Sequence, residues 1–155
     1  MTETLLEFAL ASYRREGVAE CCLRLQDGID ADVNMLLTAA WLVEQHRCWH
    51  RDDVRALIEH CQEWRERCVI PLRAIRRYLQ GHALYEALKA NELSAEIHQL
   101  HLLQDKLQSL SLQRVVGANA DLLSANLQTY IEYIHPHRVA SVDEDLCQLI
   151  ARLRR

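Results

Sequence analysis

Glycine and proline are scarce in this sequence, which has four glycines and two prolines in 155 residues. Together they make up about 4% of the chain, where roughly 12% is average. Sandwiches and barrels of β-strands need a turn about every 8–12 residues, and this chain has too few turn-forming residues to supply them. The composition therefore predicts an all-α protein, and the length predicts one domain that covers residues 1–155.

Long apolar runs and a basic start are also missing. The longest stretch without a charged residue, 33–43, has 11 residues and is too short to span a bilayer. The chain opens M-T-E-T-L-L-E, with acids where a secretory signal has basic residues. The six cysteines form no C-x-x-C pair, and in a reducing compartment they would stay unbridged. We therefore expect a cytoplasmic protein that does not associate with membranes.

Sequence motifs for catalysis and for cofactors are absent as well. The chain has no G-x-S-x-G, no H-E-x-x-H and no glycine-rich phosphate loop. Two of the eight histidines, His98 and His101, fall on one helical face, but no third ligand follows at a metal-site spacing. We therefore name no catalytic residue, metal or cofactor and favour a non-enzymatic protein. The net charge of −4 also argues against a general nucleic-acid coat, although a small footprint would fit.

What the sequence does contain is helical periodicity. Thr4-x-x-Glu7 and Ser141-x-x-Glu144 have the form of capping boxes, which mark the starts of helices. Residues 32–46 are apolar nearly all round, which is typical of a central buried helix. Pro71 must kink the helix that begins near residue 52, or start a new one. Further helices are expected over residues 3–16, 18–26, 82–110, 122–134 and from 141 onward.

The segment 82–110 has a narrow apolar stripe, which consists of Leu84, Leu88, Leu93, Ile97, Leu100 and Leu107. A stripe of this kind suggests an arm or one half of a helical hairpin, and Gly117 is expected to break the chain after it. The overall prediction is a compact bundle of about seven helices, with a long helix or helical hairpin around 82–134.

Two sequence patterns stand out. One is L-Q-D, four residues, then D-V-N-x-L-L over residues 25–37, and the other is W-R-x₃-V-x-P-L-R-x₂-R-R over residues 64–77. Together they resemble a bacterial family of uncharacterised all-helical proteins, defined as a domain of unknown function. The resemblance runs from the first helix to about residue 80, with Asp30 where the family tends to have glycine. It implies a compact intracellular helical protein and brings no activity or site residue.

The first candidate site is the acidic loop at residues 27–34. Asp27, Asp32 and Asn34 could offer oxygen ligands to a hard cation or a substrate. An EF-hand does not fit, because Met35 and Trp41 stand where that motif needs Gly and Glu. The alternative is structural: Asp30 or Asp32 would cap the helix that follows.

The second candidate site is an arginine cluster within residues 65–77, which carries a net charge of +4 and leaves −8 for the rest of the chain (−4 minus 4). Its candidate binding residues are Arg65, Arg73, Arg76 and Arg77, the last three of which share a helical face. Such arginines can fork onto phosphates or carboxylates. The alternative is a solvated face with one buried bridge to an aspartate of the 27–32 loop. We expect the loop and the arginine face to meet.

Two classes of function follow. The first is a non-enzymatic helical adaptor or regulator that binds a macromolecule. Its partner, either a protein of unknown identity or a second copy of this chain in a homodimer, would cover the apolar face of helix 82–110. The alternative is a small-molecule or metal-dependent enzyme or binder that uses the 27–34 loop facing the 65–77 arginine cluster.

Overall fold

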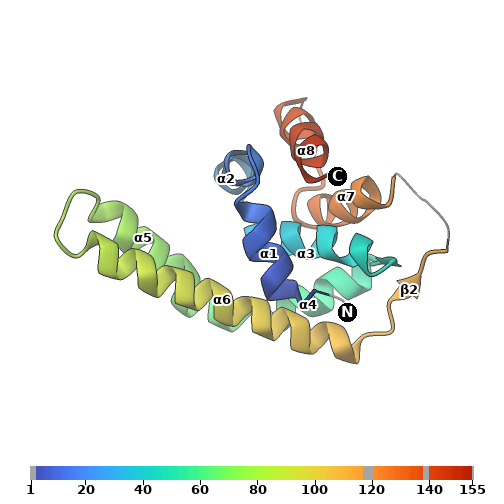
Figure 1. Cartoon of the computed structure of the whole chain (residues 1–155), viewed down its shortest axis with the longest axis horizontal. Coiled ribbons are helices and arrows are strands. Elements are labelled where there is room, and N and C mark those ends of the chain that lie inside the picture. Colours follow the sequence, from blue (N-terminus) through green and yellow to red (C-terminus); the bar gives the residue numbers. More distant parts are fainter. Residues whose placement is uncertain (1–2, 117–120, 138–139, 155) are drawn as a thin grey trace. The chain divides into compact units, whose positions relative to one another are not determined.

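The computed structural model describes residues 3–116, 121–137 and 140–154, and the fold is all-α (Figure 1). A helix at residues 65–69 with π geometry joins α4 to α5 without a break, so the described residues form seven separate helical segments. No helix among them is long and apolar enough to cross a membrane. In chain order the elements are α1 (Leu5–Tyr13), α2 (Val18–Ile29), α3 (Val33–Glu44), β1 (Arg47–Cys48), α4 (Arg51–Trp64), the π segment (Arg65–Val69), α5 (Ile70–Tyr78), α6 (Tyr85–Ser109), β2 (Gln113–Arg114), α7 (Leu122–Ile134) and α8 (Ala140–Leu153).

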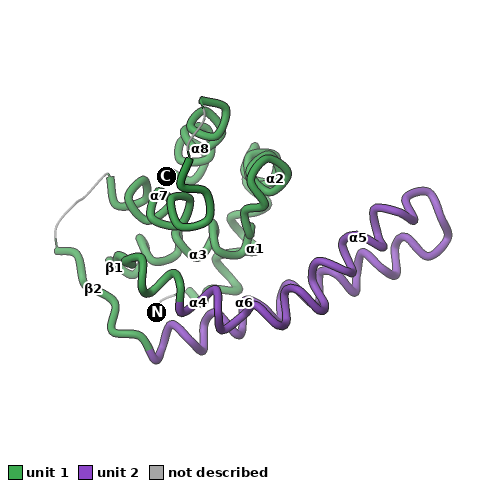
Figure 2. The backbone as a smooth tube through the Cα atoms, turned by 180° about the vertical axis from the view of Figure 1, so that it is seen from behind, with its two compact units in different colours: residues 1–55, 110–155 green, residues 56–109 purple. Residues whose placement is uncertain are grey.

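These elements pack into two compact units (Figure 2). Unit 1 consists of residues 1–55 and 110–155, and unit 2 consists of residues 56–109. Unit 1 therefore combines both ends of the sequence, whereas unit 2 is one continuous segment.

The centre of unit 1 is α3, as its apolar sequence predicts. Every residue from Asn34 to Leu42 is buried, because α1 and α7 both pack against this helix. The other main pair in unit 1 is α2 with α8, whose buried side chains include Val18, Cys22, Leu146 and Leu149. Cys22 lies so deep that burial, with a smaller effect of the neighbouring Cys21, raises the pKa of its thiol to about 12.

A two-stranded antiparallel sheet of β1 and β2 lies beside these helices, and the sequence pattern did not predict it. Directly after β1, the Trp49 side chain is only 2% exposed and donates its indole N–H to the Asn126 carbonyl at 2.7 Å. The Asn126 side chain in turn accepts from the Trp49 backbone N–H and donates to the carbonyls of Ala39 and Arg47. One buried amide thus joins α3, α7 and the strand region of unit 1.

Unit 2 contains a helical hairpin, because α5 and α6 run side by side and are joined by a tight connection (Figures 1 and 2). The long helix expected within 82–134 is α6, but its hairpin partner is α5, which precedes it. Gly81 adopts φ +84° in the connection, a left-handed conformation that glycine tolerates best. At the other end, the Trp64 indole N–H donates to the Ala95 carbonyl at 2.8 Å and the ring lies against His98.

Pro71 occupies the first turn of α5, two residues after the last residue of the π segment. Proline has no backbone N–H and its ring clashes with the carbonyl one α-helical turn earlier. The helix widens here into a π turn, in which the Ile70 N–H donates to the Arg65 carbonyl five residues back. The expected disturbance at Pro71 is therefore a π segment within a continuous helix.

One of the two predicted capping boxes is confirmed. Thr4 caps α1, with its hydroxyl accepting from the Glu7 N–H at 3.1 Å and the Glu7 carboxylate accepting from the Thr4 N–H. The box at Ser141 was wrong, because Ser141 is already inside α8, which includes Ala140. The predicted break at Gly117 lies outside the described residues.

Candidate functional site

The acidic loop of unit 1 is built into the ends of two helices. Asp32 is the N-cap of α3, and its carboxylate accepts from the Asn34 N–H at 3.0 Å. The Asp32 N–H donates to the Tyr130 hydroxyl of α7 at 2.7 Å. Asp30 closes α2 in the left-handed conformation, with φ 55°, which aspartate tolerates better than most residues. The capping interpretation of Asp32 is thus confirmed.

The other two loop candidates lie within helices. Asp27 lies in the last turn of α2, and Asn34 is a buried residue in the first turn of α3. Among the described residues, no three His, Cys, Asp or Glu side chains are grouped so that they could hold a metal ion.

The arginine cluster belongs to unit 2, where two of its members share one carboxylate. Glu92 of α6 is buried, with its side chain 9% exposed, and it accepts from both Nε and Nη2 of Arg76, the latter at 3.3 Å. Arg73 Nε lies 3.8 Å from the same carboxylate. The hydrogen bond to Glu92, followed by the Coulombic effect of its charge, raises the pKa of the Arg76 guanidinium against the opposing effect of burial.

Glu92 is therefore the carboxylate that Arg73 and Arg76 contact. The bridge from the arginine cluster to an aspartate of the 27–32 loop, and the meeting of the loop with the arginine face, stay predictions. That loop belongs to unit 1, and all four arginine candidates belong to unit 2. Arg65 is half-buried in the π segment, and Arg77 is exposed on α5. Arg67, also in the π segment, is an exposed residue 3.7 Å from the Glu63 carboxylate.

The sequence carried a signal for Glu92 that was missed. The apolar stripe proposed for this helix included Leu84 and Leu93, which are 55% and 49% exposed. The buried residues of α6 lie at 92, 95, 99, 100, 103 and 107, so the predicted stripe is confirmed at Leu100 and Leu107 but did not include Glu92. An acidic residue at the first of these buried positions, together with a run of arginines on the preceding helix α5, predicts a buried ion pair.

The side of α5 that does not face Glu92 is apolar. Ala74, Ile75 and Tyr78 lie three, four and seven residues after Pro71, which places all four on a single helical face. We call these four residues the outward face of α5. Tyr78 is 87% exposed and Ile75 is 46% exposed, so the larger side chains of this face are open to solvent.

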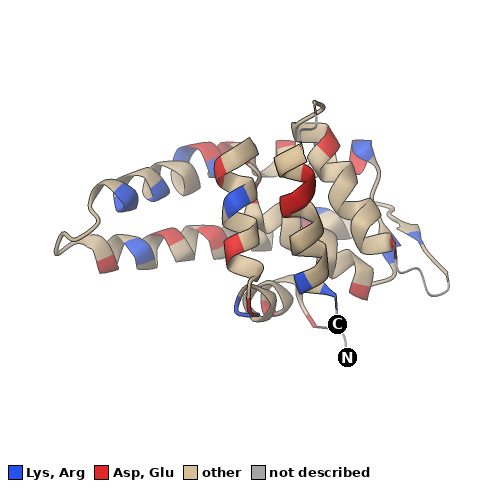
Figure 3. Ribbon diagram, turned by 90° about the horizontal axis from the view of Figure 1, so that it is seen from above, with Lys and Arg blue, Asp and Glu red and all other residues tan. Residues whose placement is uncertain are grey.

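Charge is distributed unevenly between the two helices of the hairpin. α5 has three arginines and no acidic residue, whereas α6 carries both signs along its length (Figure 3). Arg73, Arg76, Arg77 and Glu92 together carry a net charge of +2, three positive charges and one negative. The outward face of α5 is thus an apolar strip on a positively charged helix.

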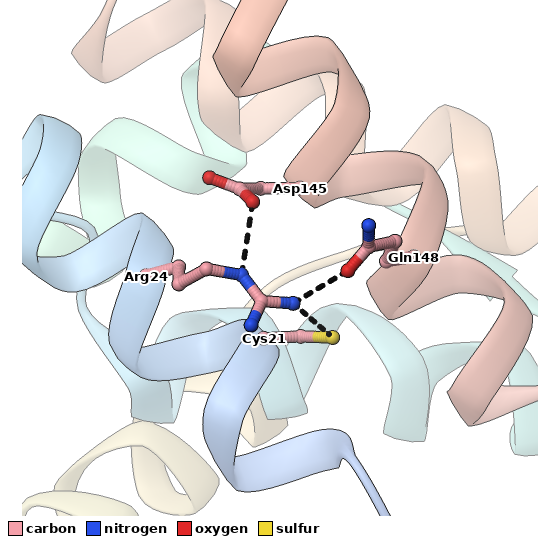
Figure 4. A network of polar contacts seen from close by, with 4 residues as sticks. All are labelled: Cys21, Arg24, Asp145 and Gln148. Atoms are coloured by element: carbon pink, nitrogen blue, oxygen red, sulfur yellow. Dashed lines mark hydrogen bonds and ion pairs between the residues drawn. The ribbon is translucent and has the colours of Figure 1, made fainter.

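A second polar network lies within unit 1, between α2 and α8 (Figure 4). Arg24 Nε donates to Asp145 at 3.0 Å, and Arg24 Nη2 donates to Gln148 at 2.5 Å and contacts the Cys21 sulfur at 3.3 Å. Nearby, Arg15 donates to the carbonyls of Leu153 and Arg154 and so caps the end of α8. The polar groups of this network satisfy one another, and their contacts hold α8 to α2. The role of the network is therefore structural.

The family model described as "Protein of unknown function (DUF2390)" matches residues 4–103. This chain belongs to that family. The predicted resemblance to an uncharacterised domain family is confirmed, and the match includes the acidic loop, the arginine cluster and Glu92, whereas α7 and α8 follow it in the chain. Searches of curated proteins and of solved structures gave no match to this chain.

Proposed function

We propose that this member of DUF2390 is a non-enzymatic adaptor of the cytoplasm that binds a protein partner through the outward face of α5. The observation that carries the proposal is the pair Ile75 and Tyr78, two large apolar side chains exposed on the same face of one helix. Helices that dock into a groove of a partner present apolar anchors three, four and seven residues after a first one. The four residues of the outward face of α5 have this pattern. Tyrosine is also one of the residue types enriched at the energetic centres of protein interfaces.

The packing of the hairpin fixes α5 but does not cover its outward face. The ion pairs of Arg73 and Arg76 with Glu92 lie between α5 and α6, so the packing of the hairpin leaves the opposite side of α5 open. A rigid, preformed helix loses little conformational freedom when it binds, which favours its use as a docking element. The cytoplasmic location is supported by the six cysteines, none of which forms a disulfide.

Site-specific photo-crosslinking in the full-length chain tests the proposal. A photoreactive residue at position 75 or 78, introduced in the native host, is expected to give a discrete crosslinked product with a second protein. The same residue at position 63, an exposed site on α4 in the same unit, is the matched control and should not give that product. Equal products from all three positions, or none from 75 and 78, would refute binding through this face.

A further inference from the structure

We infer that residues 70–94, which we call the outer hairpin, open and close as a unit of their own, and that the contacts of Glu92 with Arg73 and Arg76 are the latch that closes it. The outer hairpin consists of α5, the connection that contains Gly81 and residues 85–94 of α6. The inference stands on the packing of this segment alone and goes beyond the proposed function.

The outer hairpin has no apolar core. The structure describes every one of its residues, and Glu92 is the only one that is buried. Leu72, Leu79 and Leu88 are half-buried, so the two helices make only partial apolar contact. The rest of unit 2, residues 56–69 and 95–109, buries the apolar side chains of Leu57, Cys61, Val69, Ala95, Leu100, Leu103 and Leu107. Since burial of apolar surface is the main favourable contribution to folding, the outer hairpin gains little from closing.

The large apolar side chains of the outer hairpin lie on its outside instead. The part of the chain that the structure describes has seven exposed large apolar side chains, and four of them belong to this segment: Ile75, Tyr78, Leu84 and Leu93. Closing the hairpin leaves much of their surface in water, so these four side chains contribute little to the closed state.

The latch between the two helices is polar. Arg76 donates two hydrogen bonds to the Glu92 carboxylate and another to the Tyr85 hydroxyl at the start of α6. Arg73 Nε lies 3.8 Å from the same carboxylate. A buried ion pair adds little net stability while it is intact, but losing one partner is costly because a charge is left out of water. The closed state therefore depends on the single carboxylate of Glu92.

The segment that opens ends where apolar burial begins. Val69 and Ala95, which flank the outer hairpin, are 1% and 5% exposed, and the Trp64 indole N–H donates to the Ala95 carbonyl. Once α5 leaves α6, its nine residues are too few to stay helical, because isolated helices shorter than about 12–15 residues are marginal in water. Since α5 presents its outward face only while the hairpin is closed, the latch sets the fraction of molecules that display this face.

Native-state hydrogen exchange of the full-length protein, followed by mass spectrometry at low urea concentrations, tests the inference. In the wild type, protection factors of the helical amides within 70–94 should be at least roughly tenfold lower than those of α3 and should depend little on urea, because a local opening exposes little surface. Glu92→Gln should speed exchange of the outer hairpin by roughly a hundredfold, or to the rate of an unfolded chain. The matched control is Glu86→Gln, which removes an exposed carboxylate of the same segment and should change the rate by at most about fivefold.

A substitution in unit 1 distinguishes local opening from global unfolding. Leu146→Ala removes a buried side chain of α8, a region that stays folded when the hairpin opens. It should therefore speed exchange of α3 and leave that of the outer hairpin unchanged. If Leu146→Ala speeds both regions alike, or if the wild-type outer hairpin is as well protected as α3, independent opening is refuted. If Glu92→Gln has no larger effect than Glu86→Gln, the role of the Glu92 contacts as the latch is refuted.

Discussion

Removing the Glu92 carboxylate should destabilise the hairpin of unit 2 strongly. In Glu92→Gln the neutral amide keeps a hydrogen-bond acceptor but no longer balances the charges of Arg73 and Arg76, whose side chains are only 11% and 22% exposed. Removing one partner of a buried ion pair typically costs about 3–5 kcal/mol, because it leaves an uncompensated charge out of water. Arg76 is the more accessible of the two and can reach solvent, so we expect a loss near the lower end, about 3 kcal/mol.

The measurement is urea unfolding followed by far-UV circular dichroism, with hydrogen exchange to show whether the amides of α5 and α6 lose protection. The matched control is Glu63→Gln, which removes an 80% exposed carboxylate 3.7 Å from Arg67 and should cost at most about 1 kcal/mol. A double-mutant cycle with Arg76→Gln should show a large coupling free energy between residues 76 and 92. If Glu92→Gln costs no more than Glu63→Gln, the ion pairs do not hold the hairpin and the reasoning is wrong.

Three further changes test the framework of unit 1. Asp32→Asn keeps an oxygen for the Asn34 N–H and should cost only a few tenths of a kcal/mol in a urea melt, whereas Asp32→Ala should cost about 1 kcal/mol. Asn126→Leu removes the hydrogen-bonding partner of three backbone groups, two of them buried and one part-buried, and should cost about 3 kcal/mol in the same assay. A loss under about 1 kcal/mol would contradict the central role of that amide. The folded-state pKa of Cys22, about 12, lies above its ordinary value of 9.0, so the stability that its neutral thiol contributes is complete below pH 9 and is lost toward pH 12. Unfolding midpoints of Cys22→Ala should therefore fall less steeply than those of the wild type above pH 9, and equal slopes would refute this assignment.

Helical periodicity predicted most of the fold because helices are local. The central helix at 32–46 and the cap at Thr4 follow from neighbours within four residues, and both were found within a few residues of their predicted positions. The two-residue strands were missed because residues 47–48 and 113–114 pair across more than sixty positions, and so short a strand has no period to detect. Ser141 failed as a cap because the S-x-x-E pattern does not reveal whether the residue before it is already helical.

The candidate site was predictable only in part. The arginines of α5 were found because they repeat at helical spacing, and Asp32 was found because it precedes an apolar helix. Their ionic partner was not found, since pairing Arg76 with Glu92 requires knowing that the chain reverses near Gly81. The exposed outward face of α5 was missed for the same reason: until α6 fixes which side of α5 is covered, Ile75 and Tyr78 look like core residues.

The π segment also fixes which side of α5 faces outward. A wide turn of this kind holds one residue more than the α-helical turn it replaces, and each residue of a helix turns the next by about 100°. Deleting one residue between 65 and 69 would therefore rotate every side chain of α5 by about that angle relative to the part of α4 in unit 2. Arg73 and Arg76 would leave Glu92, and the apolar face would point elsewhere, with no residue of α5 replaced. The length of this five-residue segment, and not only the composition of α5, thus determines what the hairpin displays.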